Sequence, residues 1–64
     1  MQYDIYATLP HGGMVFSGQL NYVPHKGEEI EANGHVFIVN SVRYILRDGI
    51  SYNNQVRLIL TQLS

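Results

Sequence analysis

The dipeptide Asn33-Gly34 constrains the fold of this chain more than any other feature. A type I′ turn requires φ > 0 at both of its central residues, and Asn-Gly is a pair that meets this requirement well. The sequence therefore predicts a hairpin with strands over residues 28–32 and 35–40. Counting outwards from the turn pairs Ala32 with His35, Glu31 with Val36, Ile30 with Phe37, Glu29 with Ile38 and Glu28 with Val39. Because strand side chains alternate, each of these pairs lies on a known side of the hairpin.

Three more segments alternate between apolar and polar residues, which is the pattern of half-buried strands. They predict strands over residues 2–9, 14–23 and 55–63. No segment carries an apolar stripe at helical spacing over a useful length. Turn-forming residues separate the strands at Pro10-His11-Gly12-Gly13, at Pro24 with Gly27, at Asp48-Gly49 and at Asn53-Asn54.

The first hairpin, which joins residues 2–9 to residues 14–23, allows two registers. A four-residue loop pairs Leu9 with Met14, whereas a two-residue Gly-Gly turn pairs Leu9 with Phe16. Both registers keep the apolar residues of the two strands on one face, so the sequence leaves the choice open. Gly18 lies within the second strand, where glycine often marks a bend or a close approach of the backbone.

The alternation changes parity after Val39. Val42, Tyr44 and Leu46 continue the apolar series on the opposite parity. One extra residue in a strand produces this change, as a β-bulge does. We therefore predict a bulge at Asn40-Ser41 that turns the later apolar residues inwards again.

The chain has 64 residues, which predicts one all-β domain over 1–64 with about five antiparallel strands in a meander. A chain this short buries only about 60% of its unfolded surface, so its core is small. It contains no cysteine, which excludes disulfides and thiolate zinc sites. The predicted inward-facing residues are Ile5, Phe16, Leu20, Ile30, Phe37, Val39, Val42, Val56, Leu58 and Leu60.

Part of this pattern resembles a known family. The residues that carry the resemblance are Val23-Pro24, Gly27-Glu28, Ile30, Asn33-Gly34, Phe37, Val39 and Val42. Their order is similar to that of small SH3-like β-barrel proteins, which are short bacterial, phage and plasmid-borne open reading frames of mostly unassigned function. The resemblance implies an SH3-like barrel over nearly the whole chain. It implies no catalytic residue, because the matching positions are turn, bulge and core positions.

The charge of the chain is almost balanced, with four basic and five acidic residues and no run of like charge. This balance excludes a strong electrostatic footprint for nucleic acid. No stretch approaches the roughly 20 apolar residues that span a bilayer, and no signal peptide is visible at the first residues. We expect a soluble, cytoplasmic protein without a membrane partner.

Neither the histidines nor the carboxylates form a recognisable catalytic or metal site. The histidines are His11, His25 and His35, none of which is paired at ligand spacing. Glu29 and Glu31 share a strand face while Glu28 faces the other way, which suits a solvated strand edge. We expect no metal, no cofactor and no enzymatic activity. An enzyme built in the cleft of an oligomer is the third-ranked alternative.

Arginines and tyrosines suggest a second function. Small barrels bind single-stranded nucleic acid through basic and aromatic side chains on one surface. The candidates here are Arg43, Arg47, Arg57, Tyr44 and Tyr52. So few cations allow few phosphate contacts, which predicts weak nucleic-acid binding as the alternative to protein binding.

Several strands are apolar on both faces, although one small barrel has only one interior. A contiguous apolar patch on the outside marks an interface. The candidates for this interface are Val36, Ile38, Ile45, Ile59 and Leu63. We therefore predict a non-enzymatic binding module that self-associates, most simply as a two-fold homodimer, and that binds another protein. Alternatively, loops and long arginine side chains cover these residues within the monomer.

Overall fold

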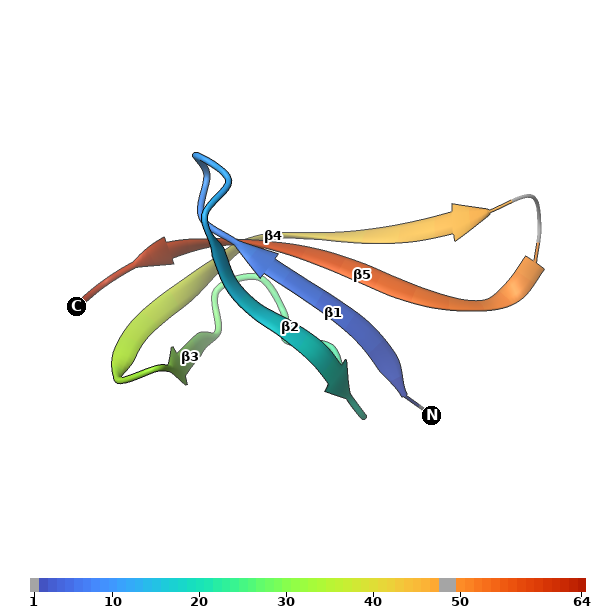
Figure 1. Ribbon diagram of the computed structural model, residues 1–64, viewed down its shortest axis with the longest axis horizontal. Helices are drawn as coiled ribbons and strands as arrows, with labels where there is room; N and C mark the ends of the chain where they lie inside the picture. Colours follow the sequence, from blue (N-terminus) through green and yellow to red (C-terminus); the bar gives the residue numbers. More distant parts are fainter. Residues whose placement is uncertain (1, 48–49) are drawn as a thin grey trace.

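The computed structural model describes residues 2–47 and 50–64, and five strands make up its regular structure (Figure 1). The strands are β1 (Tyr3–Thr8), β2 (Met14–Leu20), β3 (Glu29–Ala32), β4 (His35–Arg47) and β5 (Ile50–Gln62). This confirms the all-β prediction. No helix long and apolar enough to cross a membrane occurs in the part of the chain that the structure describes.

The sequence predicts two turns after Arg47. The loop predicted at Asn53-Asn54 is wrong, because β5 includes both residues, although its pairing with β4 is irregular between Ile50 and Gln55. The turn predicted at Asp48-Gly49 lies outside the described residues. β4 and β5 are therefore long strands of 13 residues each, and they extend past the other three strands in Figure 1.

The five strands form one sheet in the order β2-β1-β5-β4-β3. The pairs β1/β2, β3/β4 and β4/β5 are antiparallel, but β1 and β5 are parallel, so the prediction of an antiparallel meander is wrong. The reason is geometric. Strands that alternate in direction along the chain give the first and the fifth the same direction, and here these two pair with each other. The sheet is thus mixed.

The β3–β4 hairpin has the register predicted for it. Glu29 pairs with Ile38 and Ala32 pairs with His35, as counted from the turn. Asn33 and Gly34 have φ angles of 55° and 81°, so both central residues of the turn are in the left-handed region. Beyond the strand, the Val39 N–H donates to the Glu28 carbonyl at 2.9 Å, which continues the predicted pairing by one residue.

From Tyr3 to Ala7, β1 and β2 have the register that follows from pairing Leu9 with Met14, one of the two that the sequence allows. The loop between the strands differs from both predictions. The Leu9 N–H donates to the Gly13 carbonyl at 2.8 Å, and the Gly12 N–H donates to the Leu9 carbonyl at 2.9 Å. The loop therefore has three residues and ends on Gly12, whose φ of 103° suits a glycine after a tight turn. A bulge follows, because Ala7 pairs with Phe16 whereas Thr8 pairs with Met14. This bulge places Met14 on the face of Thr8 rather than on that of Phe16, so the predicted common face is wrong.

The predicted bulge in β4 is confirmed. Val39 pairs with Leu60 and Ser41 pairs with Ile59, so Asn40 is the extra residue. The Asn40 amide donates to the Thr61 hydroxyl and so holds the bulge against β5. After the bulge the even-numbered residues face the core, whereas before it the odd-numbered residues do, as one extra residue requires.

The core lies on the concave side of the curled sheet. Its buried residues are Ile5, Ala7, Phe37, Val39, Val56, Leu58 and Leu60. Six of the ten predicted inward residues are in this set, and the other four, Phe16, Leu20, Ile30 and Val42, are half-buried against it. The prediction missed Ala7, which is fully buried where β5 crosses beside β1.

The sheet curls into a half-barrel. β2 and β3 are its two edges, and a cavity of about 150 Å³ lies between them, lined by residues of both such as Phe16, Leu20, Ile30 and Ala32. The Asn33 amide donates to the Val15 carbonyl at 3.4 Å and so links the two ends of the sheet. The opening explains why three of the four half-buried core residues are not fully covered, because Phe16, Leu20 and Ile30 lie on the edge strands.

Candidate functional site

The aliphatic residues predicted as an interface lie among polar neighbours. Ile38 stands between Glu29 and Thr61, and Ile59 stands between Ser41 and Thr8. Val36, Ile38, Ile45 and Ile59 are all half-buried within the single chain, whereas Leu63 is 52% exposed. The structure therefore places these residues on one side of β4 and β5 without gathering them into a wide exposed apolar patch.

Larger apolar exposure occurs on the second half of β4. Tyr44 is 56% exposed and Leu46 is 79% exposed, although both have the parity that faces the core. Tyr44 lies opposite the fully buried Val56 of β5. The two side chains thus belong to the inner side of the sheet but are not covered by the rest of the chain.

The reason lies in the short length of β3. β3 pairs with β4 only from His35 to Ile38, and the loop before it adds hydrogen bonds to Val39. From Ser41 to Ile45, β4 pairs with β5 on one edge, and the pairing is irregular at Leu46. Within residues 2–47 and 50–64 no strand pairs with the other edge of this segment. We call residues 41–46 the free β4 edge.

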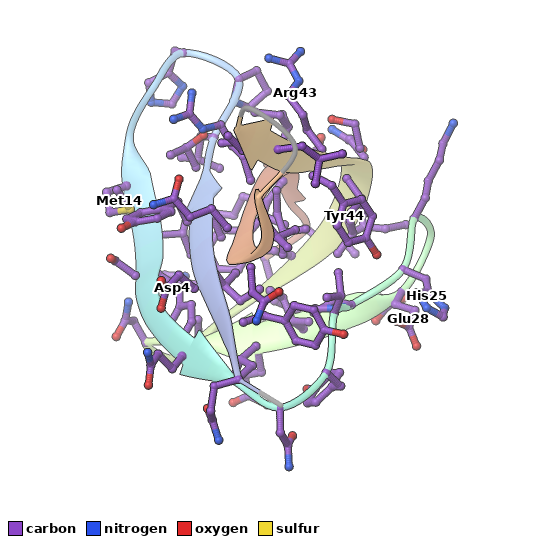
Figure 2. The ribbon with its side chains drawn as sticks, turned by 90° about the vertical axis from the view of Figure 1, so that its right-hand side faces the viewer. Asp4, Met14, His25, Glu28, Arg43 and Tyr44 are labelled. Atoms are coloured by element: carbon purple, nitrogen blue, oxygen red, sulfur yellow. The ribbon has the colours of Figure 1, made fainter. Side chains whose placement is uncertain are left out.

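Two of the predicted nucleic-acid residues meet on the opposite face of the sheet, which we call the outer face. Arg43 of β4 lies directly opposite Arg57 of β5, and Arg57 lies beside Tyr6 of β1. Tyr44 follows Arg43 on the strand and points in a different direction (Figure 2), so it does not join the arginines. The side chains of Arg47 and Tyr52 lie outside the described part of the structure.

A pocket of about 400 Å³ opens on the outer face beside these arginines. It is lined by Tyr6, Thr8, Leu9, Pro10, Gly12, Met14, Ser41, Arg43, Arg57 and Ile59. One wall is the β1–β2 loop, and the floor is formed by three neighbouring strands, β1, β5 and β4. The place of Tyr6 beside Arg57 could not be predicted from the sequence, because it depends on the parallel pairing of β1 with β5.

The histidines are spread over the molecule. His11 lies in the β1–β2 loop, His25 lies in the loop before β3, and His35 begins β4. Among the residues whose positions are described, no three His, Cys, Asp or Glu side chains lie close enough together to hold a metal ion. The His35 ring instead packs edge-on against Phe37, with ring centroids 6.5 Å apart.

The carboxylates also have local contacts. The Glu28 carboxylate accepts a hydrogen bond from the His25 backbone N–H, and both residues lie together in the loop before β3 (Figure 2). Glu29 and Glu31 are exposed on the edge strand β3. Asp4 accepts a hydrogen bond from the Gln19 amide at 2.9 Å across β1 and β2. These contacts stabilise a turn and a strand pair.

Comparison with known proteins gives no relative from which to transfer a function. The chain matches no protein-family model, no curated protein and no solved structure. Two surfaces of the described structure are therefore the candidates for function, the free β4 edge and the pocket on the outer face.

Proposed function

We propose that this chain is a non-enzymatic binding module that self-associates through the free β4 edge, most simply as a two-fold homodimer. The observation that supports this is the exposure of Tyr44 and Leu46 on the core side of a strand segment whose second edge has no partner strand in the described chain. Apolar side chains with core parity and an unpaired edge are the features that a further strand would cover.

The free β4 edge is suited to pairing with a copy of itself. An unpaired strand edge presents a row of N–H and C=O groups that act as a template for another strand. Antiparallel pairing of a segment with its own copy is two-fold symmetric, which is the commonest symmetry of homo-oligomers. Such pairing extends the sheet across the dimer and places Tyr44 and Leu46 beside their counterparts.

Chain length gives a reason for association. Below roughly 70–80 residues a single core rarely supplies more than about 3–5 kcal/mol, and disulfides, metals or oligomerisation commonly add to it. Cysteine is absent here. Burial of two large apolar side chains from each subunit therefore contributes stability that the seven buried core residues do not supply alone.

The proposal includes three broader expectations. The module works in the cytoplasm and binds a further protein in addition to itself. Its half-barrel is related to the SH3-like barrels that the sequence resembles, with the free edge used for association. The support for these expectations is the cysteine-free sequence and the small curled sheet.

The native mass of the untagged protein tests the proposal. We expect the wild type to be a dimer, and we expect Leu46→Ser to shift it to the monomer mass. Leu63→Ser is the matched control, because Leu63 is also an exposed leucine but lies outside the free β4 edge.

A monomeric wild type at all accessible concentrations contradicts self-association. Another result identifies the surface predicted from the sequence instead. If the double change of Ile38 and Ile59 to Ser dissociates the dimer while Leu46→Ser leaves it intact, the interface is the outer face and the free β4 edge is not used.

A further inference from the structure

The pocket on the outer face brings two like charges together. Arg43 and Arg57 are directly opposed on neighbouring antiparallel strands, and both are exposed. Like charges directly opposite each other on neighbouring strands destabilise a sheet. A bound anion removes this repulsion, so the pair favours an anionic ligand.

Among the residues that the structure describes, none that lines the pocket is acidic. Glu29 and Glu31 lie on β3, on the far side of β4 from β5 and β1. Asp4 shares the outer face with Tyr6 but is hydrogen bonded to Gln19 on β2. Arg43 and Arg57 are thus the charged groups among the described lining residues, and their charge is opposite in sign to the net charge of −1 of the whole chain.

The rest of the pocket is aromatic, aliphatic and hydroxyl-bearing. Tyr6, which is 36% exposed, lies beside Arg57 on the neighbouring strand. Met14, Leu9 and Ile59 add apolar surface, while Thr8 and Ser41 add hydroxyl groups. A volume of about 400 Å³ lies within the range of small-ligand sites, which is roughly 300–1,000 Å³. The pocket thus combines groups for a phosphate with groups for a flat ring.

We propose that this pocket binds single-stranded nucleic acid and holds one nucleotide of it, with phosphates on Arg43 and Arg57 and a base against Tyr6. Guanidinium groups bind phosphate oxygens in a bidentate manner, and aromatic side chains stack on bases that have no partner strand. A duplex does not fit this chemistry, because its bases are already stacked on each other. Tight binding of a protein to a duplex also depends on many more cations than this pocket has.

The site is complete within one chain and does not rest on the homodimer. Its residues project from the outer face of β1, β4 and β5, whereas the dimer uses the edge of β4 and the inner side chains Tyr44 and Leu46. A monomeric variant such as Leu46→Ser therefore keeps the pocket. The failure of one proposal leaves the other standing.

The test is the salt dependence of binding to a fluorescein-labelled oligothymidylate of about ten nucleotides, a length within the site sizes of small barrels. Each phosphate neutralised on a single strand contributes about −0.7 to the slope of log K against log salt, so two phosphates give about −1.4. We expect Arg43→Gln and Arg57→Gln each to reduce the magnitude of this slope by about 0.7.

Two further variants separate stacking from charge. Tyr6→Ala is expected to weaken binding by about 5- to 150-fold, the usual loss for one stacked base, without changing the slope. Tyr6→Phe retains the ring and should bind as the wild type does. Lys26→Gln is the control for charge, because Lys26 is an exposed cation in the loop before β3 and does not line the pocket.

Folding of the variants is checked by thermal melting. Because Arg43→Gln removes a like-charge contact, its melting temperature should equal or exceed that of the wild type. The absence of salt-dependent binding overturns the proposal, and so does a Lys26→Gln effect as large as that of the arginines. Equal competition by thymidine monophosphate, counted per nucleotide, overturns it in favour of a site for a free nucleotide.

Discussion

The two halves of β4 have the same alternating pattern but different surroundings. Before the bulge, Phe37 and Val39 are buried, because β3 and the loop before it pair with that part of the strand. After the bulge, Tyr44 and Leu46 have the same inward parity and are largely exposed. Alternation in a sequence thus identifies the side of a sheet on which a residue lies, while the lengths of the neighbouring strands decide whether that side is covered.

The same substitution in the two halves gives the sharpest test of this contrast. Leu60 of β5 is fully buried opposite Val39 and packs beside the covered half of β4. We expect Leu60→Ala to lower the free energy of unfolding by about 2–5 kcal/mol, as large-to-small changes in cores do. Because this approaches the whole stability of a small domain, the variant should be partly unfolded in a urea titration at room temperature. A loss below about 1 kcal/mol would show that the first half of β4 is poorly packed.

The turn that fixes the covered half is expected to give the next largest effect. Gly34 has a φ of 81°, and a side chain in the left-handed region costs roughly 1–2 kcal/mol. Gly34→Ala should therefore lower the urea concentration at the midpoint of unfolding. The slope of the unfolding free energy against urea concentration should stay the same. Gly18→Ala is the control, since Gly18 has no positive φ, although a Cβ there would lie 3.1 Å from the Phe16 ring and the ring must shift slightly. Equal losses of unfolding free energy in the two variants would mean that the positive φ of Gly34 does not cause the destabilisation.

The smallest effect is expected on the exposed half. Leu46→Ala should change the free energy of unfolding of the monomer by no more than about 0.5 kcal/mol, because surface substitutions rarely do more. The measurement is a urea titration at protein concentrations where the wild type has dissociated. A loss similar to that of Leu60→Ala would show that Leu46 is covered within the monomer, and the contrast between the two halves would disappear.

Local features of the fold could be predicted from the sequence, and distant pairings could not. Asn33-Gly34 specifies its hairpin register because the turn and the strands are contiguous. The parity change after Val39 likewise indicates the bulge at Asn40, since both lie in one strand. The parallel pairing of β1 with β5 joins the two ends of the chain, and no turn between them determines it.

The candidate site shows the same division. The sequence proposes Arg43, Arg47 and Arg57 for one surface, and the structure places Arg43 opposite Arg57, while the Arg47 side chain lies outside the described part. Tyr44 lies next to Arg43 in the sequence and is therefore on the other side of the strand, a conclusion that alternation alone supports. Tyr6 is the aromatic residue that the structure places beside Arg57, and it is found only when β1 is known to lie against β5.

The bulge at Asn40 decides which side of the sheet Val42, Arg43 and Tyr44 face. Loss of Asn40 itself would leave their partners unchanged, because Val39 and Ser41 already pair with the adjacent residues Leu60 and Ile59. Loss of the bulge with Asn40 retained would instead move Arg43 to the core side and Tyr44 to the outer face, since a shift of one residue exchanges the two faces of a strand. One sequence therefore carries two possible surfaces on the second half of β4, and a single unpaired residue selects between them.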